Sequence, residues 1–174
     1  MKLSLIEWDS RNLLLEHLAK TERTVLIGRD IESPASFFSC RAPSSAGYVE
    51  IGVISNQTGG SVCCELLRSG KFLCIGRDQA VTIVDLAKVK IHLDERLDGV
   101  FFEFVADDSR NQVLAIHELG VVAISLDAHV NWRRSSADIL EDWQIIGGSI
   151  QLSAMDEETM LVDLASGAIL PSHL

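Results

Sequence analysis

Short apolar runs separated by turn residues recur along most of this sequence, and this pattern constrains the fold more than any other feature. From Thr24 onward the runs are rich in Val and Ile, and Gly, Asp, Asn and Ser fill the gaps between them. Many short strands joined by tight turns are typical of an all-β protein. Only residues 10–21 predict a helix, because Ser10 can cap it and its leucines fall at helical spacing.

The later strands form a repeat. Three pairs each close an apolar run, at steps of 40 and 38 residues: Asp85-Leu86, Ser125-Leu126 and Asp163-Leu164. A period of about 40 residues with four strands in each unit is that of a β-propeller blade. By this grouping, residues 72–104 hold the four strands of one unit, and the next unit begins at residue 113.

Two hairpins carry a resemblance to a known family. Residues 121–132 (VVAISLDAHVNW) and 160–170 (MLVDLASGAIL) resemble blade hairpins of the pyrroloquinoline-quinone-type and WD-repeat propellers. The resemblance covers about residues 71–170. Because complete propellers have about four to eight blades, it implies a partial or half β-propeller-like array of antiparallel meander sheets with one N-terminal helix. A β-sandwich is the alternative. No residue can be matched to a quinone ligand of that family.

The length of 174 residues suits one domain, residues 1–174. Within it, residues 1–45 are expected to form a helix-containing N-terminal segment and residues 46–174 the propeller-like sheets. Pro34 and Pro43 bracket a loop-prone stretch that is expected to join the two parts, although Ser36–Cys40 within it is one of the strand-like apolar runs. The sequence has no signal peptide and no apolar stretch long enough to span a membrane, so we expect a cytoplasmic protein.

The sequence contains no motif for catalysis, phosphate binding or zinc binding. The adjacent Cys63 and Cys64 lie in an expected strand, where neighbours point to opposite faces and make a poor chelate. We therefore expect no enzyme activity, no cofactor and no metal. The four cysteines are expected to be small buried residues in a reducing compartment.

The distribution of charge indicates a partner. The net charge is −10, and the last forty residues contain seven acidic residues but no Lys or Arg. This excess argues against direct binding to nucleic acid or anionic membrane and favours a basic protein. The candidate contact residues are Asp107, Asp108, Glu141, Asp142, Trp143, Asp156, Glu157 and Glu158. The alternatives are that the carboxylates only solvate the surface and that Trp143 belongs to the core.

A small acidic protein without catalytic residues resembles, in these general properties, the bacterial immunity proteins of contact-dependent growth inhibition. The resemblance implies an antitoxin, a monomer or dimer, that neutralises a basic protein toxin, expected to be a nuclease, by covering its active or substrate-binding surface. A propeller-like scaffold for protein–protein interaction is the alternative function. A small hydrolase is the second alternative.

Overall fold

The computed structural model describes residues 3–57, 62–155 and 159–171. Within these ranges there are one helix and sixteen strands, and the strands form four four-stranded sheets. The first sheet contains β1 (Ile6–Trp8), β2 (Thr24–Ile27), β3 (Ser36–Ser44) and β4 (Gly47–Ser55). The second contains β5 (Cys63–Leu66), β6 (Phe72–Arg77), β7 (Ala80–Asp85) and β8 (Lys90–Arg96). The third contains β9 (Phe101–Asp107), β10 (Gln112–His117), β11 (Gly120–Ser125) and β12 (Val130–Ser135). The fourth contains β13 (Leu140–Ile146), β14 (Ser149–Ala154), β15 (Met160–Asp163) and β16 (Ile169–Leu170).

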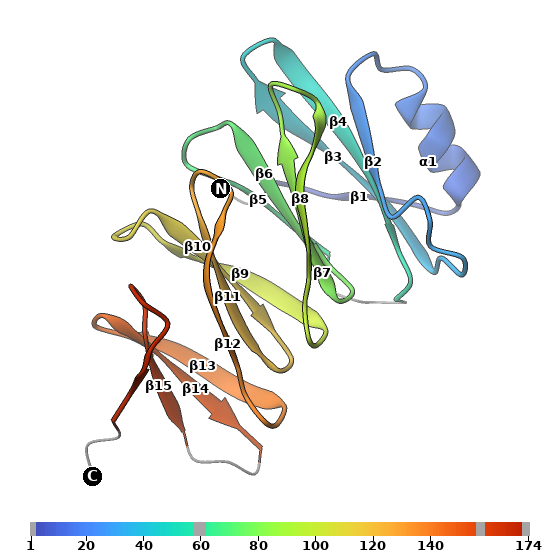
Figure 1. The fold of residues 1–174 in the computed structure, drawn as a ribbon. Coiled ribbons are helices and arrows are strands. Elements are labelled where there is room, and N and C mark those ends of the chain that lie inside the picture. Colours follow the sequence, from blue (N-terminus) through green and yellow to red (C-terminus); the bar gives the residue numbers. More distant parts are fainter. Residues whose placement is uncertain (1–2, 58–61, 156–158, 172–174) are drawn as a thin grey trace.

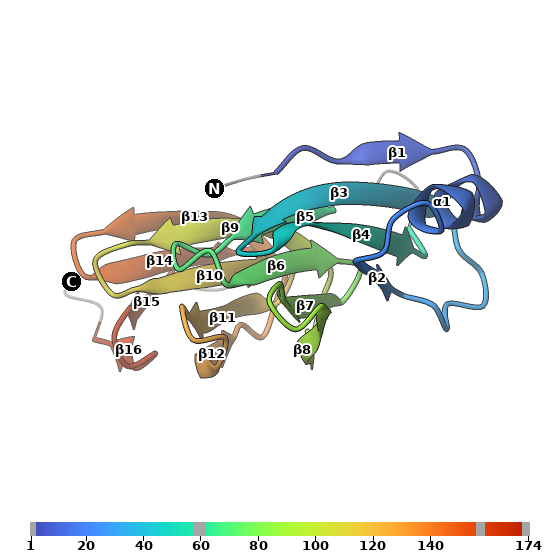
Figure 2. The same cartoon turned by 90° about the horizontal axis from the view of Figure 1, so that it is seen from above.

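The second, third and fourth sheets are antiparallel meanders whose strands follow one another in chain order. The four sheets stack face against face along the chain (Figures 1 and 2). Strands β6 and β10 are buried along their whole length, because a sheet covers each of their faces. A two-sheet sandwich would cover only one face of each strand. The predicted array of antiparallel meander sheets is therefore confirmed.

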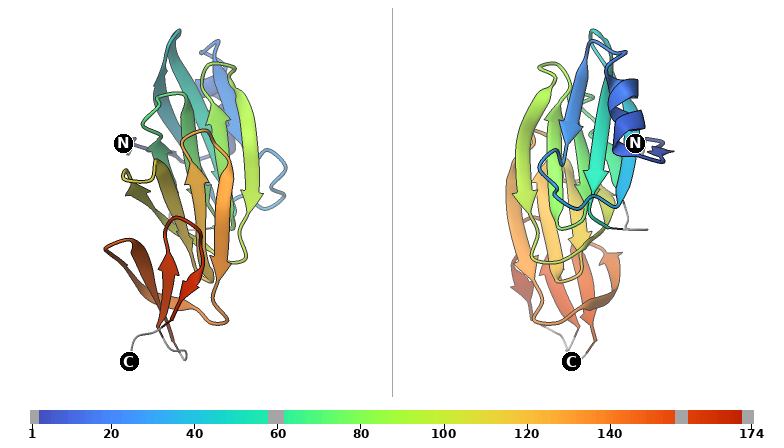
Figure 3. Two further views of the ribbon diagram at one scale, coloured as in Figure 1. Left: turned by 60° about the vertical axis from the view of Figure 1, so that its left-hand side comes forward. Right: turned by 90° about the vertical axis from the view of Figure 1, so that its right-hand side faces the viewer.

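The first sheet has a different topology. Its order is β1-β3-β4-β2, and β2 pairs with β4 in parallel. Helix α1 (Arg11–Leu18) lies between β1 and β2 in the chain and packs Leu14 and Leu18 on the outer face of this sheet (Figure 3, right). A Cβ on Gly52 of β4 would lie 2.6 Å from Cδ1 of Leu18, so glycine lets the helix approach closely. The predicted helix and its Ser10 cap are confirmed, since the Ser10 side chain accepts a hydrogen bond from Leu13 N–H.

Two sequence predictions about the N-terminal part differ from the structure. The stretch between Pro34 and Pro43 is largely β3, not a loop. Strand β1 pairs only with Phe37–Ser39, so at Pro43 one edge of β3 is open and a missing N–H is tolerated there. The border between residues 45 and 46 falls in the β3–β4 turn. Strand β4 therefore belongs to the same sheet as the N-terminal strands.

The repeat has the predicted period but starts one strand earlier. Asp85, Ser125 and Asp163 each end the third strand of a sheet. Strand β9, assigned from the sequence to the second sheet, pairs with β10, and β13 likewise pairs with β14. The assignment was wrong because spacing does not say whether the chain turns back into its own sheet or crosses to the next one.

The residues that mark the repeat cap its turns. Oδ1 of Asp85 accepts hydrogen bonds from the N–H groups of Ala87 and Lys88, both at 3.0 Å. Oδ1 of Asp163 accepts the N–H of Ser166 at 2.8 Å in the equivalent turn. The leucine that follows each aspartate is fully buried. The second and fourth sheets therefore share one turn device, in which a carboxylate accepts hydrogen bonds from turn amides and a buried leucine follows it.

Apolar layers hold successive sheets together. The layer between the second and third sheets contains Phe72, Cys74, Ile83, Phe101, Phe104 and Ile124. Within it the Phe101 ring lies directly over Gly76, where a Cβ would be 2.2 Å from the nearest ring carbon. Between the third and fourth sheets the Trp132 ring lies over Gly167, and its Nε1–H donates to the Leu164 carbonyl at 3.1 Å. Large rings over glycines thus fix how these sheets stack.

Candidate functional site

The predicted contact residues separate into two groups at opposite ends of β9. Asp107 and Asp108 lie at the end of this strand. Trp143 contacts residues at the start of β9. Its ring stacks on Phe102 with centroids 5.8 Å apart, and its Nε1–H donates a hydrogen bond to Glu103 at 3.1 Å. Asp156, Glu157 and Glu158 lie outside the described residues. The described candidates therefore form two surfaces, not one.

Asp107 is a structural part of the β9–β10 turn. Its side chain is buried and accepts hydrogen bonds from Ser109 at 2.6 Å and from Gln112 at 3.1 Å, with Arg110 at 3.3 Å. Burial alone would raise the pKa of Asp107, but these hydrogen bonds and the Arg110 charge lower it overall. The carboxylate is thus ionised and already has its partners.

Glu141 and Asp142 are exposed at the start of β13, which is an edge strand of the fourth sheet. Within the described ranges neither carboxylate has an ion pair. Asp142 accepts the N–H of Trp143 at 2.9 Å, which fixes the local backbone. Trp143 is half-buried and also packs against the apolar layer between the third and fourth sheets. These two carboxylates therefore project from a well-fixed strand end.

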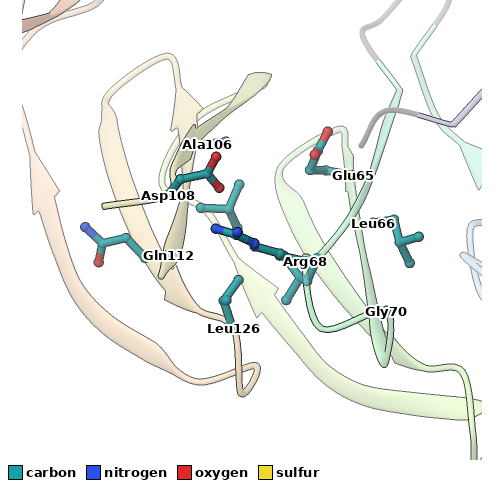
Figure 4. Close-up of a pocket in the computed structure, with 10 residues that line it drawn as sticks. Glu65, Leu66, Arg68, Gly70, Ala106, Asp108, Gln112 and Leu126 are labelled. Atoms are coloured by element: carbon teal, nitrogen blue, oxygen red, sulfur yellow. The ribbon is translucent and has the colours of Figure 1, made fainter. Parts of the chain in front are cut away.

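A pocket of about 410 Å³ opens between the second and third sheets (Figure 4). Its walls come from β5 and the β5–β6 turn on one side, and from β9, β10 and the residue after β11 on the other. The lining residues are Glu65, Leu66, Leu67, Arg68, Gly70, Ala106, Asp108, Gln112, Val113 and Leu126. Its floor is thus apolar and its rim carries charges of both signs.

Hydrogen bonds hold one wall of the pocket rigidly. Gln112 is buried, and its Nε2 donates to the Leu164 carbonyl at 2.7 Å and to Asp107 at 3.1 Å. Its Oε1 accepts a hydrogen bond from Asn131 at 3.1 Å. These contacts reach three different segments of the third and fourth sheets. The third-sheet wall therefore keeps its shape without a bound molecule.

The opposite wall carries the most adaptable group. Arg68 is exposed in the β5–β6 turn and extends across the pocket toward the third sheet (Figure 4). Among the described contacts its guanidinium has no hydrogen bond or ion pair. Asp108 lies exposed on the facing rim. Among the residues that line this pocket, the sequence analysis identified only Asp108. Leu66, Leu67 and Leu126 have the pattern of ordinary strand residues in the sequence. The local signal that pointed to a binding site was Arg68, a charged residue directly after two leucines.

A second polar cluster joins the first and second sheets. Asp78 is buried, pairs with Arg77 Nη1 at 3.0 Å, and accepts hydrogen bonds from the Ser55 hydroxyl and the Asn56 N–H. These contacts tie the end of β4 to the β6–β7 turn. The cluster is fully explained as a structural link, because each Asp78 oxygen has a partner within the fold.

The described cysteines are free thiols that fill the apolar layers. Cys40, Cys64 and Cys74 are buried and Cys63 is half-buried. The hydrogen bond with Cys40, together with burial, raises the pKa of the Cys64 thiol, and burial raises that of Cys74. Across the described residues, no three His, Cys, Asp or Glu side chains are placed to hold a metal ion. No helix in the described part of the chain is long and apolar enough to cross a membrane.

No family model and no curated protein matches the sequence. Among solved structures, the chain is similar to "Dihydro-heme d1 dehydrogenase NirN in complex with DHE", with 10% identity and a TM-score of 0.53 over 78% of this chain and 32% of that one. It is also similar to the Cps50 (Swd1) beta-propeller domain of Myceliophteria thermophila, with 20% identity and a TM-score of 0.47 over 67% of this chain and 39% of that one. The chain spans about a third of the first structure. The chain therefore has a β-propeller-like fold, in which the second, third and fourth sheets are the blade-like meanders.

Proposed function

We propose that this chain is a protein-interaction scaffold that binds a basic protein and has no catalytic activity of its own. The supporting observation is that Glu141 and Asp142 on one surface, and Asp108 on another, are exposed at strand ends without ion pairs among the described residues. Binding residues are commonly presented by the loops and strand ends of a rigid scaffold. Exposed carboxylates without a paired cation attract an oppositely charged partner and speed association.

The pocket between the second and third blades does not support hydrolysis through a Ser, Thr or Cys nucleophile. Its lining contains no Ser, Cys, Thr or His, so it offers no hydroxyl or thiol nucleophile with an imidazole base beside it. An antitoxin that covers a basic nuclease is the narrowest form of this proposal. That form rests on the net charge of −10.

The faces at the two ends of the array differ. Helix α1 covers the outer face of the first sheet. On the fourth sheet, β14 turns Gln151 to the outer face, and its paired neighbours Leu161 and Leu170 lie on the same face. This outer face is therefore only partly polar, whereas terminal units of stacked arrays commonly have polar outer faces. Light scattering distinguishes a monomer from a dimer in which a second copy covers this face.

The test is a pull-down from the source cell with the whole chain as bait, at low and then high salt. The double variant E141K D142K should capture several-fold less of a stoichiometric basic partner than the unchanged chain, because salt-screened surface attraction supplies much of the association rate. E22K E32K is the matched control, since both glutamates are exposed in the N-terminal segment and the net charge changes by the same amount. Equal capture by both variants, or capture that salt does not weaken, would contradict the proposed charge recognition.

A further inference from the structure

The pocket between the second and third blades carries one cation and one carboxylate on facing rims. Arg68 extends across the pocket from the β5–β6 turn, and Asp108 faces it from the turn after β9 (Figure 4). Both side chains are exposed, and among the described contacts neither forms an ion pair, with the other or with a third group. The pocket therefore offers one uncompensated charge of each sign.

The remaining polar groups at this rim are already engaged within the chain. Glu65 lines the pocket but has an interaction of its own. Asp107 pairs with Arg110 at 3.3 Å and accepts two further hydrogen bonds. The side-chain amide nitrogen of Gln112 donates to two acceptors inside the fold. Arg68 and Asp108 are thus the charged side chains that remain to bind a ligand.

Apolar side chains form the floor below these two charges. Leu66, Leu67 and Val113 are buried, and Leu126 is half-buried. All four belong to the packed layers on either side of the second blade. The volume of about 410 Å³ lies toward the lower end of the range for ligand pockets, so it suits a small molecule. An apolar group can leave water on this floor while charged atoms of the same molecule stay at the rim.

We propose that this pocket binds a free apolar α-amino acid. The ligand carboxylate accepts hydrogen bonds from the Arg68 guanidinium, whose planar fork of donors matches a carboxylate. The ligand ammonium group pairs with Asp108. The apolar side chain of the ligand lies on the floor formed by Leu66, Val113 and Leu126.

The two opposite charges select this class of ligand. A fatty acid would pair with Arg68 but would place its carboxylate beside Asp108. An apolar amine would pair with Asp108 but would meet the Arg68 charge. In both cases one charged group of the pocket loses water without gaining a partner, which is unfavourable and discriminates against the ligand. A zwitterion with an apolar side chain satisfies both charges and the floor together.

The two walls of the pocket differ in a way that favours binding. The third-blade wall is held by the hydrogen bonds of Gln112, which reach Leu164 of the fourth blade. Arg68 stands in a turn and can adjust to the ligand carboxylate. Little of the binding energy is then spent on ordering the pocket.

Titration of the whole chain, labelled at its Leu and Val methyl groups, with L-leucine tests this inference by NMR. The methyl signals of Val113 and Leu126 should shift and saturate, with a dissociation constant of about 1 mM or lower. N-Acetyl-L-leucine lacks the ammonium charge and L-leucinamide lacks the carboxylate, so each should bind at least about fivefold more weakly. No saturable shift with L-leucine, L-methionine or L-phenylalanine would overturn the inference, and so would equal binding of the two blocked compounds.

Variants of the two rim charges assign each ligand group to its partner. R68Q should weaken L-leucine binding about fivefold but leave L-leucinamide binding unchanged, because that compound has no carboxylate. D108N should likewise weaken L-leucine and leave N-acetyl-L-leucine unchanged. The matched controls are R96Q and D127N, since Arg96 and Asp127 are exposed and do not line this pocket. Rim variants that weaken L-leucine and its blocked forms equally would contradict the assignment.

A tryptophan at the rim tests the pocket as a whole. Ala106 is exposed and lines the pocket, so A106W should fill it and abolish L-leucine binding with the circular dichroism spectrum unchanged. A165W places the same ring at an exposed site in the fourth blade and should bind L-leucine normally. L-Leucine binding that survives A106W would overturn the inference.

This inference is independent of the proposed basic protein partner. Glu141 and Asp142 lie on another surface, so E141K D142K should bind L-leucine as the unchanged chain does. A failed pull-down therefore leaves the amino-acid site standing. Absence of L-leucine binding, with a partner still captured, refutes the amino-acid site alone.

Discussion

Gly76→Ala should destabilise the chain through one contact between the second and third blades. The backbone of Gly76 is not in the left-handed region, so alanine fits its conformation. The added Cβ would lie 2.2, 2.3 and 2.4 Å from three carbons of the Phe101 ring, and that ring is buried at the centre of the layer. Overpacking of this kind costs about 1–3 kcal/mol. Replacing glycine within a strand recovers roughly 0.5–1 kcal/mol.

Three rigid ring carbons within 2.4 Å place the cost at the upper end of that range, about 3 kcal/mol. The net expectation is then a loss of about 2 kcal/mol in the free energy of unfolding, or a fall in Tm of roughly 4–8 °C for a chain of this size. Urea unfolding followed by circular dichroism measures it, and the m-value should stay unchanged. Gly52→Ala is the control. Its Cβ would meet the flexible end of Leu18 at 2.6 Å, which can move aside, so its loss should be below about 1 kcal/mol.

The double variant G76A F101L decides whether the ring is the cause. Leucine is smaller than phenylalanine and leaves room for the new methyl group. The double variant should therefore lose about 1–2 kcal/mol less than the sum of the two single losses. If the losses add to within about 0.5 kcal/mol, the ring does not lie over Gly76, and the stacking of the second and third blades is wrong.

Two further predictions concern single side chains. His117 is buried, its Nδ1 has no partner among the described residues, and burial lowers its pKa, so the unfolded chain takes up this proton more readily. The free energy of unfolding should therefore fall as the pH drops through about 6.5. H117L should lose this part of the pH dependence when urea unfolding is compared at pH 7.5 and 5.5. An H117L variant whose stability depends on pH as the unchanged chain does would contradict the burial of His117. D85A should cost about 1–2 kcal/mol by thermal unfolding because Asp85 holds two turn amides, whereas the exposed D127A should change stability by less than ~0.5 kcal/mol.

The sequence predicted those parts of the fold that are encoded locally. Asp85 and Asp163 bind amides two and three residues further on, so their spacing reports the turns and the period directly. The pairing of β9 with β10 and the parallel pairing of β2 with β4 are not local. They depend on which side of a sheet the chain crosses to, and for this reason the start of the repeat and the border at residue 45 were misplaced.

The candidate site was predicted only where a residue was polar and stood in a turn. Asp108 met this criterion, and so did Asp107, although the structure gives Asp107 its own partners within the turn. Leu66 and Leu126 line the same pocket from different blades, sixty residues apart in the chain. Each reads as a core residue in the sequence. Their shared surface exists only because two blades stack, which no local pattern expresses.

The stacking of the second, third and fourth blades is tested most directly by nuclear Overhauser contacts in the whole labelled chain. The Phe101 ring protons should show strong contacts to the Hα protons of Gly76, and the Trp132 ring protons should show them to Gly167. Both glycines should also have Hα resonances shifted upfield by the ring above them. Both sets of contacts together confirm that the third blade packs against a blade on each face. A third sheet with contacts on one face only, as in a sandwich, would contradict the account.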